Sequence, residues 1–462
     1  MGITAGIMLP HPPLIVPEIG RGEERKIQKT VEAYHQAAEK IGAYQPDTIV
    51  LISPHQTMYA DYFHISPGDG AVGDFSQFHA AEVKMELSYD TEFVRELCRL
   101  AETRRLPAGT MGERDKQLDH GTMVPLYFVN QYWRNYRLVR IGLSGESLFM
   151  HYELGKCIKE AAADLGRNAV VIGSGDLSHR LKEDGPYGYQ EEGPEYDRRI
   201  MDVMGRAAFG ELFDFSEDFL NNAGECGHRS FTIMAGALDR TAVASERLSY
   251  EGPFGVGYGI CTYEAQGQDD GRNFADRFET VLMEKLAEQR AKEDAYVRLA
   301  HSTVEAYVRT GKKPAVPEDL SKEMYEMRAG VFVSIKKQGK LRGCIGTIAP
   351  VYGSIAEEII ENAVSASSRD PRFSPIGPEE LKYLTLSVDV LGEAERITSA
   401  AELDVKRYGV IVTKGSKRGL LLPNLEGVDT VADQVAIAKQ KAGIREDDED
   451  VELERFEVTR HF

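Results

Sequence analysis

Short apolar runs alternate with longer amphipathic or polar stretches from the N-terminus to about residue 265. The runs are rich in aliphatic and β-branched residues and show no helical period, which is typical of buried strands. They lie at residues 7–9, 48–53, 136–143, 170–172 and 257–263. Two of the intervening stretches, residues 22–43 and 150–165, favour helices. Strands that alternate with helices predict an α/β domain, with a central sheet and helices on both of its faces.

A different pattern follows a polar, glycine-bearing segment at residues 264–272, which we interpret as a linker. Beyond it, residues 273–310 carry apolar side chains at helical spacing. The rest is mixed, and it predicts a hairpin at 330–348, a helix at 354–367 and a strand at 384–391. Because 462 residues exceed one ordinary core, we expect two domains, residues 1–266 and a smaller one at 273–462.

Composition restricts the partners and the compartment. The formal net charge of −19 argues against nucleic acid or an anionic membrane as a general partner. No apolar run approaches the roughly 18 residues that span a bilayer, and prolines interrupt the apolar N-terminal stretch, so it does not resemble a signal peptide. The five cysteines are scattered, as expected of a reduced cytoplasmic protein.

Four histidines lie where short runs or turns end, namely His11, His55, His120 and His179. In open α/β sheets, ligands bind beyond the carboxyl ends of the strands. Imidazole is the commonest neutral metal ligand and the usual acid or base near neutral pH. Nine of the eleven histidines precede residue 268. We therefore expect one site in the first domain, with a metal ion.

His11 and His55 are the natural first two ligands, and Glu225 offers a carboxylate as the third. Two histidines and one carboxylate on one face of a metal form the arrangement of non-heme Fe(II) oxygenases. The open positions allow an organic substrate and O₂ to bind the same ion. His120 and His179 would then act beside the metal as acid/base and hydrogen-bonding groups.

At these residues the chain resembles the class III extradiol ring-cleaving dioxygenases, over residues 1 to about 265. The resemblance rests on Pro10-His11-Pro12-Pro13, Ser53-Pro54-His55, Asp119-His120-Gly121 and Gly175-Asp176-Leu177-Ser178-His179. It implies Fe(II) held by His11, His55 and Glu225, and a small catecholic or related aromatic substrate that is opened by O₂. It also implies that His179 is the acid/base and that His120 contacts the substrate or oxygen.

The Memo family shares this fold, and its Cys-Gly-Arg-type motif is similar to Cys226-Gly227-His228-Arg229 here. That likeness makes Cys226 a competing third ligand. A softer thiolate site favours copper or zinc over iron. Two further hypotheses follow from it: a metal-binding partner module without catechol turnover, and a hydrolase that uses zinc-activated water.

In the second domain, Cys344 stands between two glycines in Leu341-Arg342-Gly343-Cys344-Ile345-Gly346. This motif, with Arg369-Asp370-Pro371-Arg372-Phe373, resembles the AMMECR family, which implies a smaller α+β domain. Cys344 is either a packed core residue in a tight turn or a reactive thiol, with Arg342, Asp370 and Arg372 around it. The fusion is similar to the AmmeMemoRadiSam system, which implies a radical S-adenosylmethionine protein as a partner; a homo-oligomer is a further expectation.

Overall fold

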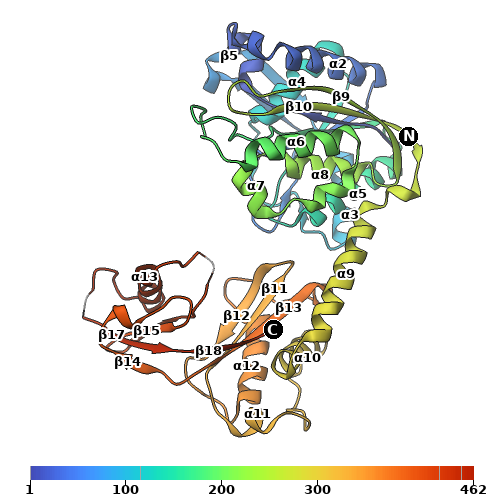
Figure 1. Cartoon of the computed structure of the whole chain (residues 1–462). Coiled ribbons are helices and arrows are strands. Elements are labelled where there is room, and N and C mark those ends of the chain that lie inside the picture. The colour runs from blue at the N-terminus through green and yellow to red at the C-terminus, as the bar shows by residue number, and fades with distance from the viewer. Residues whose placement is uncertain (1, 115, 426, 449) are drawn as a thin grey trace. The chain divides into compact units, whose positions relative to one another are not determined.

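The computed structural model describes residues 2–114, 116–425, 427–448 and 450–462 (Figure 1). The chain forms two compact units, which divide between Glu279 and Thr280. In the described residues, no helix combines the length and apolar character needed to cross a membrane.

A six-stranded sheet forms the centre of the first unit. Its strand order is β7 (Arg137–Gly142), β2 (Thr48–Ser53), β8 (Ala169–Ser174), β1 (Ile3–Leu9), β10 (Tyr258–Gln268) and β9 (Thr241–Glu251). The first four strands are parallel, and β10 and β9 add an antiparallel edge. Every residue of β2 and β8 is buried, as expected of parallel strands that are covered on both faces.

Helices cover both faces of this sheet because successive residues of a strand point to opposite sides. Ile49 and Leu51 pack in one core with residues of α2 (Gln28–Tyr44) and α4 (His120–Tyr132). Val50 and Ile52 pack in the other core with four further helices, namely α3 (Thr91–Thr103), α5 (Leu148–Asp164), α6 (Glu192–Gly205) and α8 (His228–Ala237). The predicted α/β architecture is confirmed (Figure 1).

Further elements of this unit lie outside the central sheet and its covering helices. They are α1 (Pro17–Gly20), α7 (Glu217–Ala223), the small pair β3 (Phe63–His64) with β6 (Ala108–Gly109), and the hairpin β4 (Gly70–Phe75) with β5 (Ala80–Ser88).

The boundary lies later than the sequence analysis places it. Residues 264–268 are the end of strand β10, which pairs with β9 as far as Gln268 opposite Thr241. Gly267, interpreted above as a linker residue, has φ of 123° at a shift of register in this ladder. Helix α9 (Phe274–Lys292) follows, and its Phe278 stacks on Phe213 at 4.5 Å between ring centroids. The polar composition therefore reflects an exposed strand end rather than a linker.

The second unit contains two four-stranded sheets. The first has the order β12 (Lys340–Gly346), β11 (Val331–Lys337), β13 (Leu384–Leu391) and β18 (Val458–His461). The second has the order β14 (Glu395–Ile397), β17 (Glu452–Phe456), β15 (Gly409–Lys414) and β16 (Lys417–Leu421). Helices α10 (Ala295–Thr310), α11 (Lys322–Glu326) and α12 (Ile355–Ser368) accompany the first sheet and α13 (Val431–Ala442) the second.

The hairpin, helix and strand predicted for this unit are present, at β11–β12, α12 and β13. The segment 273–310, with apolar side chains at helical spacing, forms the two helices α9 and α10. Asp294 separates them, because its carboxylate accepts hydrogen bonds from the backbone N–H groups of Tyr296 and Val297 and so starts α10.

Candidate metal centre

Two histidines meet at the carboxyl ends of the central strands. His11 follows β1 and is buried, whereas His55 follows β2 and is exposed. Their Nε2 atoms are 2.9 Å apart. Because β1 and β2 both lie beside β8, residues that are 44 positions apart in the sequence end at the same edge of the sheet.

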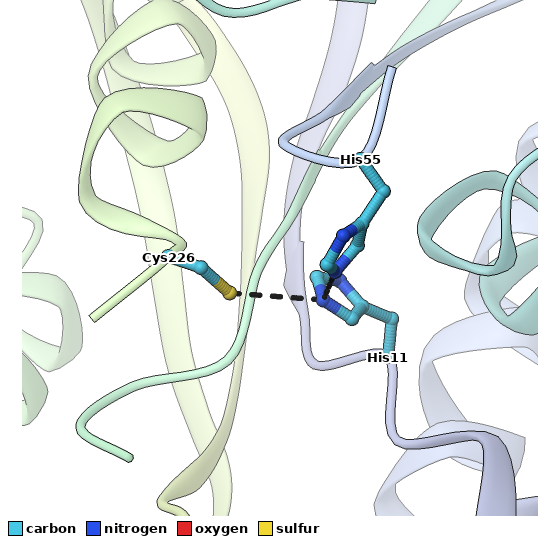
Figure 2. A group of neighbouring side chains, drawn as sticks. All are labelled: His11, His55 and Cys226. Carbon is cyan, nitrogen blue, oxygen red and sulfur yellow. Dashed lines mark hydrogen bonds between the residues drawn. The ribbon is translucent and has the colours of Figure 1, made fainter. Parts of the chain in front are cut away.

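Cys226 completes this group from a segment far away in the sequence. Its Sγ lies 3.7 Å from His11 Nε2, and Figure 2 shows the three side chains pointing toward one another. The ligand atoms of His11, His55 and Cys226 all lie within 4.8 Å of one another. A tetrahedral ion with ordinary Zn–S and Zn–N bonds would hold its sulfur ligand and a nitrogen ligand about 3.6 Å apart. The distance between Cys226 and His11 therefore suits a shared ion.

Two glycines let the Cys226 segment approach the end of β8. A Cβ atom on Gly175 would lie 2.1 Å from Gly227 Cα, so the two segments could not come this close with a side chain at position 175. A Cβ atom on Gly227 would lie 2.3 Å from the ring of Phe231. The backbone N–H of Asp176 donates to Cys226 Sγ at 3.2 Å, and this bond holds the sulfur in position. Burial raises the pKa of the Cys226 thiol well above its ordinary value, so metal binding would have to displace its proton.

Glu225, expected as the third ligand, lies outside this group of donor atoms. Its carboxylate accepts a hydrogen bond at 2.6 Å from the backbone N–H of His228, the first residue of α8. Glu225 thus satisfies a free N–H at a helix start, while its neighbour Cys226 reaches the histidines. His228 itself is buried, with its Nε2 at 3.0 Å from the carbonyl oxygen of Leu212.

Hydrogen bonds around His11 fix the orientation of its ring. The Ser174 hydroxyl donates to the carbonyl oxygen of Gly121 at 2.6 Å, so at the 2.9 Å contact with His11 it accepts a hydrogen bond from the Nδ1–H group. That tautomer leaves the lone pair on Nε2, the atom that faces Cys226 and His55. Burial, and then the proximity of His55, holds the pKa of His11 well below its ordinary value.

His120 lines the same site as the first residue of α4. Its ring centroid is 3.9 Å from that of His55 and 5.4 Å from that of His11. Burial, His55 and His11 together lower the pKa of His120 to about 4, so the ring is neutral at pH 7. Asp119 caps the helix through the N–H of Thr122.

A buried ion pair lies behind His120. Arg140 Nη2 is 3.0 Å from Asp119 Oδ2, and both side chains are shielded from solvent. Burial alone would raise the pKa of Asp119, but Arg140 and the hydroxyl of Ser53 outweigh it and keep the pKa below its ordinary value. Asp119 is therefore an ionised group that fixes the start of α4 and the end of β2.

His179 faces the site from the loop after β8. Its Nδ1 lies 2.5 Å from the carbonyl oxygen of Gly224, which can only accept, so Nδ1 carries a proton and Nε2 is the nitrogen left to face the site. Asp176 Oδ2 is 3.9 Å from that Nε2.

Asp176 is a site residue that sequence reasoning missed. Its Oδ1 accepts a hydrogen bond from the backbone N–H of His11 at 2.8 Å, and burial raises the pKa of its carboxyl group. The sequence feature that could have identified Asp176 is its position in the motif that ends at His179.

The structure brings together three of the four residues singled out in the second unit. The backbone N–H of Cys344 donates to Asp370 Oδ2 at 2.9 Å, and Arg372 Nη2 donates to the Cys344 carbonyl oxygen at 3.2 Å. Arg342, expected beside the thiol, instead forms an ion pair with Glu380 at 2.9 Å.

The glycines on either side of Cys344 allow neighbouring groups to pack closely against strand β12. A Cβ atom on Gly343 would lie 2.2 Å from the Ala366 carbonyl oxygen of α12, and one on Gly346 would lie 2.2 Å from the ring of Phe332.

Fold and site together define an α/β domain with a candidate metal centre at the carboxyl ends of its parallel strands, fused to a second domain with its own sheets. The chain belongs to the LigB family: residues 5–261 match the family described as the catalytic LigB subunit of aromatic ring-opening dioxygenase. Residues 297–461 match the AMMECR1 family.

Some similar proteins match the whole chain, and others match only a part of it. A protein of Clostridium acetobutylicum is 44% identical over 470 residues, which cover 100% of this chain and 99% of that protein. A protein of Thermotoga maritima is 50% identical over 170 residues, which cover 37% of this chain and 98% of that protein. The crystal structure of an uncharacterized Pyrococcus horikoshii protein is 35% identical, with a TM-score of 0.34, and the match covers 36% of this chain and 88% of that one.

Proposed function

We propose that the first unit is a metal-dependent oxidoreductase of the ring-opening dioxygenase type, with its metal ion held by His11, His55 and Cys226. One observation carries the proposal. Donor atoms from three segments far apart in the sequence lie within 4.8 Å of one another, where the central strands end. His55 is exposed, so a small substrate has access to this group from solvent.

A redox-active ion bound by three protein ligands supplies open positions for an organic substrate and for O₂. The protein's own residues then handle protons and orientation. His179 Nε2 takes a proton from a bound hydroxyl group and later returns it. Asp176, 3.9 Å away, stabilises the imidazolium that forms. His120 is neutral, so it offers hydrogen bonding without repelling a cation.

The donor set fits a metal, but it is softer than the two histidines and one carboxylate expected for Fe(II). A thiolate beside two imidazoles favours copper or zinc. This observation supports a second candidate function, in which a zinc ion at the same ligands activates water and the domain is a hydrolase. Iron or copper with aromatic ring opening belongs to the first candidate, and zinc with hydrolysis belongs to the second.

Metal analysis of protein purified without oxygen tests the ligand set. We expect H11A, H55A and C226A each to lose most of the metal, because two remaining donors hold an ion poorly. E225Q is the matched control, since glutamine still accepts the His228 N–H bond and leaves Cys226 in place. Full metal in C226A with loss in E225Q would move the third ligand to Glu225. Oxygen uptake with a panel of catechols then separates the two functions.

A further inference from the structure

The first sheet of the second unit has an apolar face and a polar face. On β13, Leu386 is buried in the core of this unit, whereas its neighbours Thr385 and Ser387 are half-buried. Successive residues of a strand point to opposite faces. Lys336 of β11 lies opposite Thr385 in the ladder, and residues directly opposite in an antiparallel pair share a face. Lys336, Thr385 and Ser387 are therefore on the polar face.

A pocket lies where the edge of this sheet is left open. The pairing of β18 with β13 ends at His461, opposite Val388, so residues 384–387 have no strand partner on that side in the described part of the chain. Phe462 follows, and its side chain is 72% exposed. The pocket has a volume of about 400 Å³ and is lined by Phe462, by residues of β11 and β13, and by the end of α9. This volume is sufficient for a small organic molecule.

Three cationic side chains line the pocket. Arg290 is fixed by a hydrogen bond of 2.7 Å from its Nη2 to the carbonyl oxygen of Leu381, while its buried Nε has no hydrogen-bond partner among the described residues. Lys292 ends α9, and Lys336 belongs to β11. Both lysines are exposed, and neither forms an ion pair with any residue that the structure describes. The cations of the pocket are therefore not neutralised by neighbouring carboxylates.

The negative charge at the pocket already has partners. Glu293 is the acidic side chain among the described lining residues, and its carboxylate lies 2.9 Å from His301 Nδ1. The main-chain oxygen of Phe462 accepts a hydrogen bond from the backbone N–H of Asp294 at 3.4 Å. Three cationic side chains and one carboxylate leave the lining side chains with an excess of two positive charges. The pocket thus favours an anion.

Two hydroxyl groups add neutral donors. Neither Thr385 nor Ser387 uses its hydroxyl in a hydrogen bond to a residue within the described ranges. With Arg290 Nε and the ammonium groups of Lys292 and Lys336, they make five donor groups. A carboxylate has only two oxygens and one charge, whereas a phosphate monoester carries roughly 1.5 to 2 negative charges at pH 7 and three strong acceptor oxygens. Charge and donor number therefore match a phosphate group better.

We propose that this pocket binds small organic phosphates, namely phosphate monoesters that carry an apolar ring. Arg290, Lys292 and Lys336 bind the phosphate group, and the two hydroxyls of β13 donate to its oxygens. The exposed ring of Phe462 packs against the apolar part of the ligand. The site uses no residue of the metal centre, so it is independent of the function of the first unit.

The test measures the binding of phenyl phosphate, benzoate and inorganic phosphate to the intact chain. Saturation-transfer NMR gives dissociation constants for the two aromatic ligands, and competition with phenyl phosphate gives that of inorganic phosphate. We expect phenyl phosphate to bind at least about tenfold more tightly than benzoate, because it forms more charge-assisted hydrogen bonds. It should bind about two- to tenfold more tightly than inorganic phosphate, because only the ester packs on Phe462. F462A should remove this second difference.

Two variants test the donors. K336E should weaken the binding of phenyl phosphate at least about tenfold, and T385V about two- to tenfold, as expected for one hydrogen bond. Both should keep the wild-type melting temperature, because neither side chain has a partner among the described residues. K312E is the matched control, since Lys312 is an exposed lysine of the same unit that does not line the pocket. H11A is the control for the metal centre and should bind phenyl phosphate as the wild type does.

Several results would overturn the proposal. One is the absence of saturable phenyl phosphate binding, and another is benzoate that binds at least as tightly. Inorganic phosphate that binds as tightly as phenyl phosphate would remove the apolar part of the ligand. Equal weakening by K336E and K312E would reduce the effect to general electrostatic attraction. Loss of binding in H11A but not in K336E would place the phosphate at the metal centre instead.

Discussion

Gly175 is the position where one added methyl group tests how the candidate metal centre is built. The Cβ atom of an alanine would lie 2.1 Å from Gly227 Cα, whereas carbon atoms in contact sit about 3.5–4.0 Å apart. In G175A the two segments must separate by about 1.4 Å or more. Because Cys226 immediately precedes Gly227, its sulfur moves away from His11 and His55 by a similar distance.

The substitution G175A should lower both the free energy of unfolding and the metal affinity. Overpacking of this kind costs about 1–3 kcal/mol of the free energy of unfolding. A displaced ligand should weaken metal affinity at least as much as the loss of an outer-sphere partner, about 10–100-fold. G205A is the matched control, since the nearest atom to its new Cβ, on Arg247, is 3.7 Å away. Gly205 ends helix α6, so alanine there should stabilise by about 0.4–1 kcal/mol.

The chain suits this measurement because its single tryptophan, Trp133, lies in the first unit. Trp133 fluorescence in urea therefore reports the unfolding of that unit, and a competition titration with Zn²⁺ reports metal affinity. Wild-type Zn²⁺ affinity in G175A would refute the coupling between this glycine contact and Cys226. A wild-type urea midpoint would refute the steric argument itself.

Three further predictions concern a proton, a pH range and the division of the chain. H179Q should keep its metal and slow turnover about 10²–10⁴-fold; loss of metal would make His179 a ligand. Burial raises the pKa of Asp197 to about 7, from 3.8, so between these pH values the unfolded chain has lost a proton that the folded chain keeps. The free energy of unfolding should therefore fall as pH rises through this range and should fall less in D197N; equal slopes would contradict this. A fragment of residues 1–292 should fold and hold all the metal, whereas one of residues 1–266 should be less stable, because it lacks Phe278 and its stacking on Phe213; equal urea midpoints would argue against that packing.

Local sequence patterns determined most of the architecture. Apolar runs without a helical period predicted the buried strands β2 and β8, because a parallel strand that is covered on both faces must be apolar along its whole length. His11 and His55 could be paired from sequence for a related reason. Parallel strands of one sheet end at a common edge, so residues that follow them converge.

Only the tertiary structure decided which of several candidate side chains reaches each site. Glu225 and Cys226 are adjacent in the sequence. Glu225 accepts a hydrogen bond from the start of α8, whereas the close contact of Gly175 with Gly227 places Cys226 beside the histidines. Likewise Arg342 pairs with Glu380, and Arg372 lies at the Cys344 backbone instead. Composition cannot distinguish such pairs, because the direction of a side chain depends on contacts with segments that are distant in the sequence.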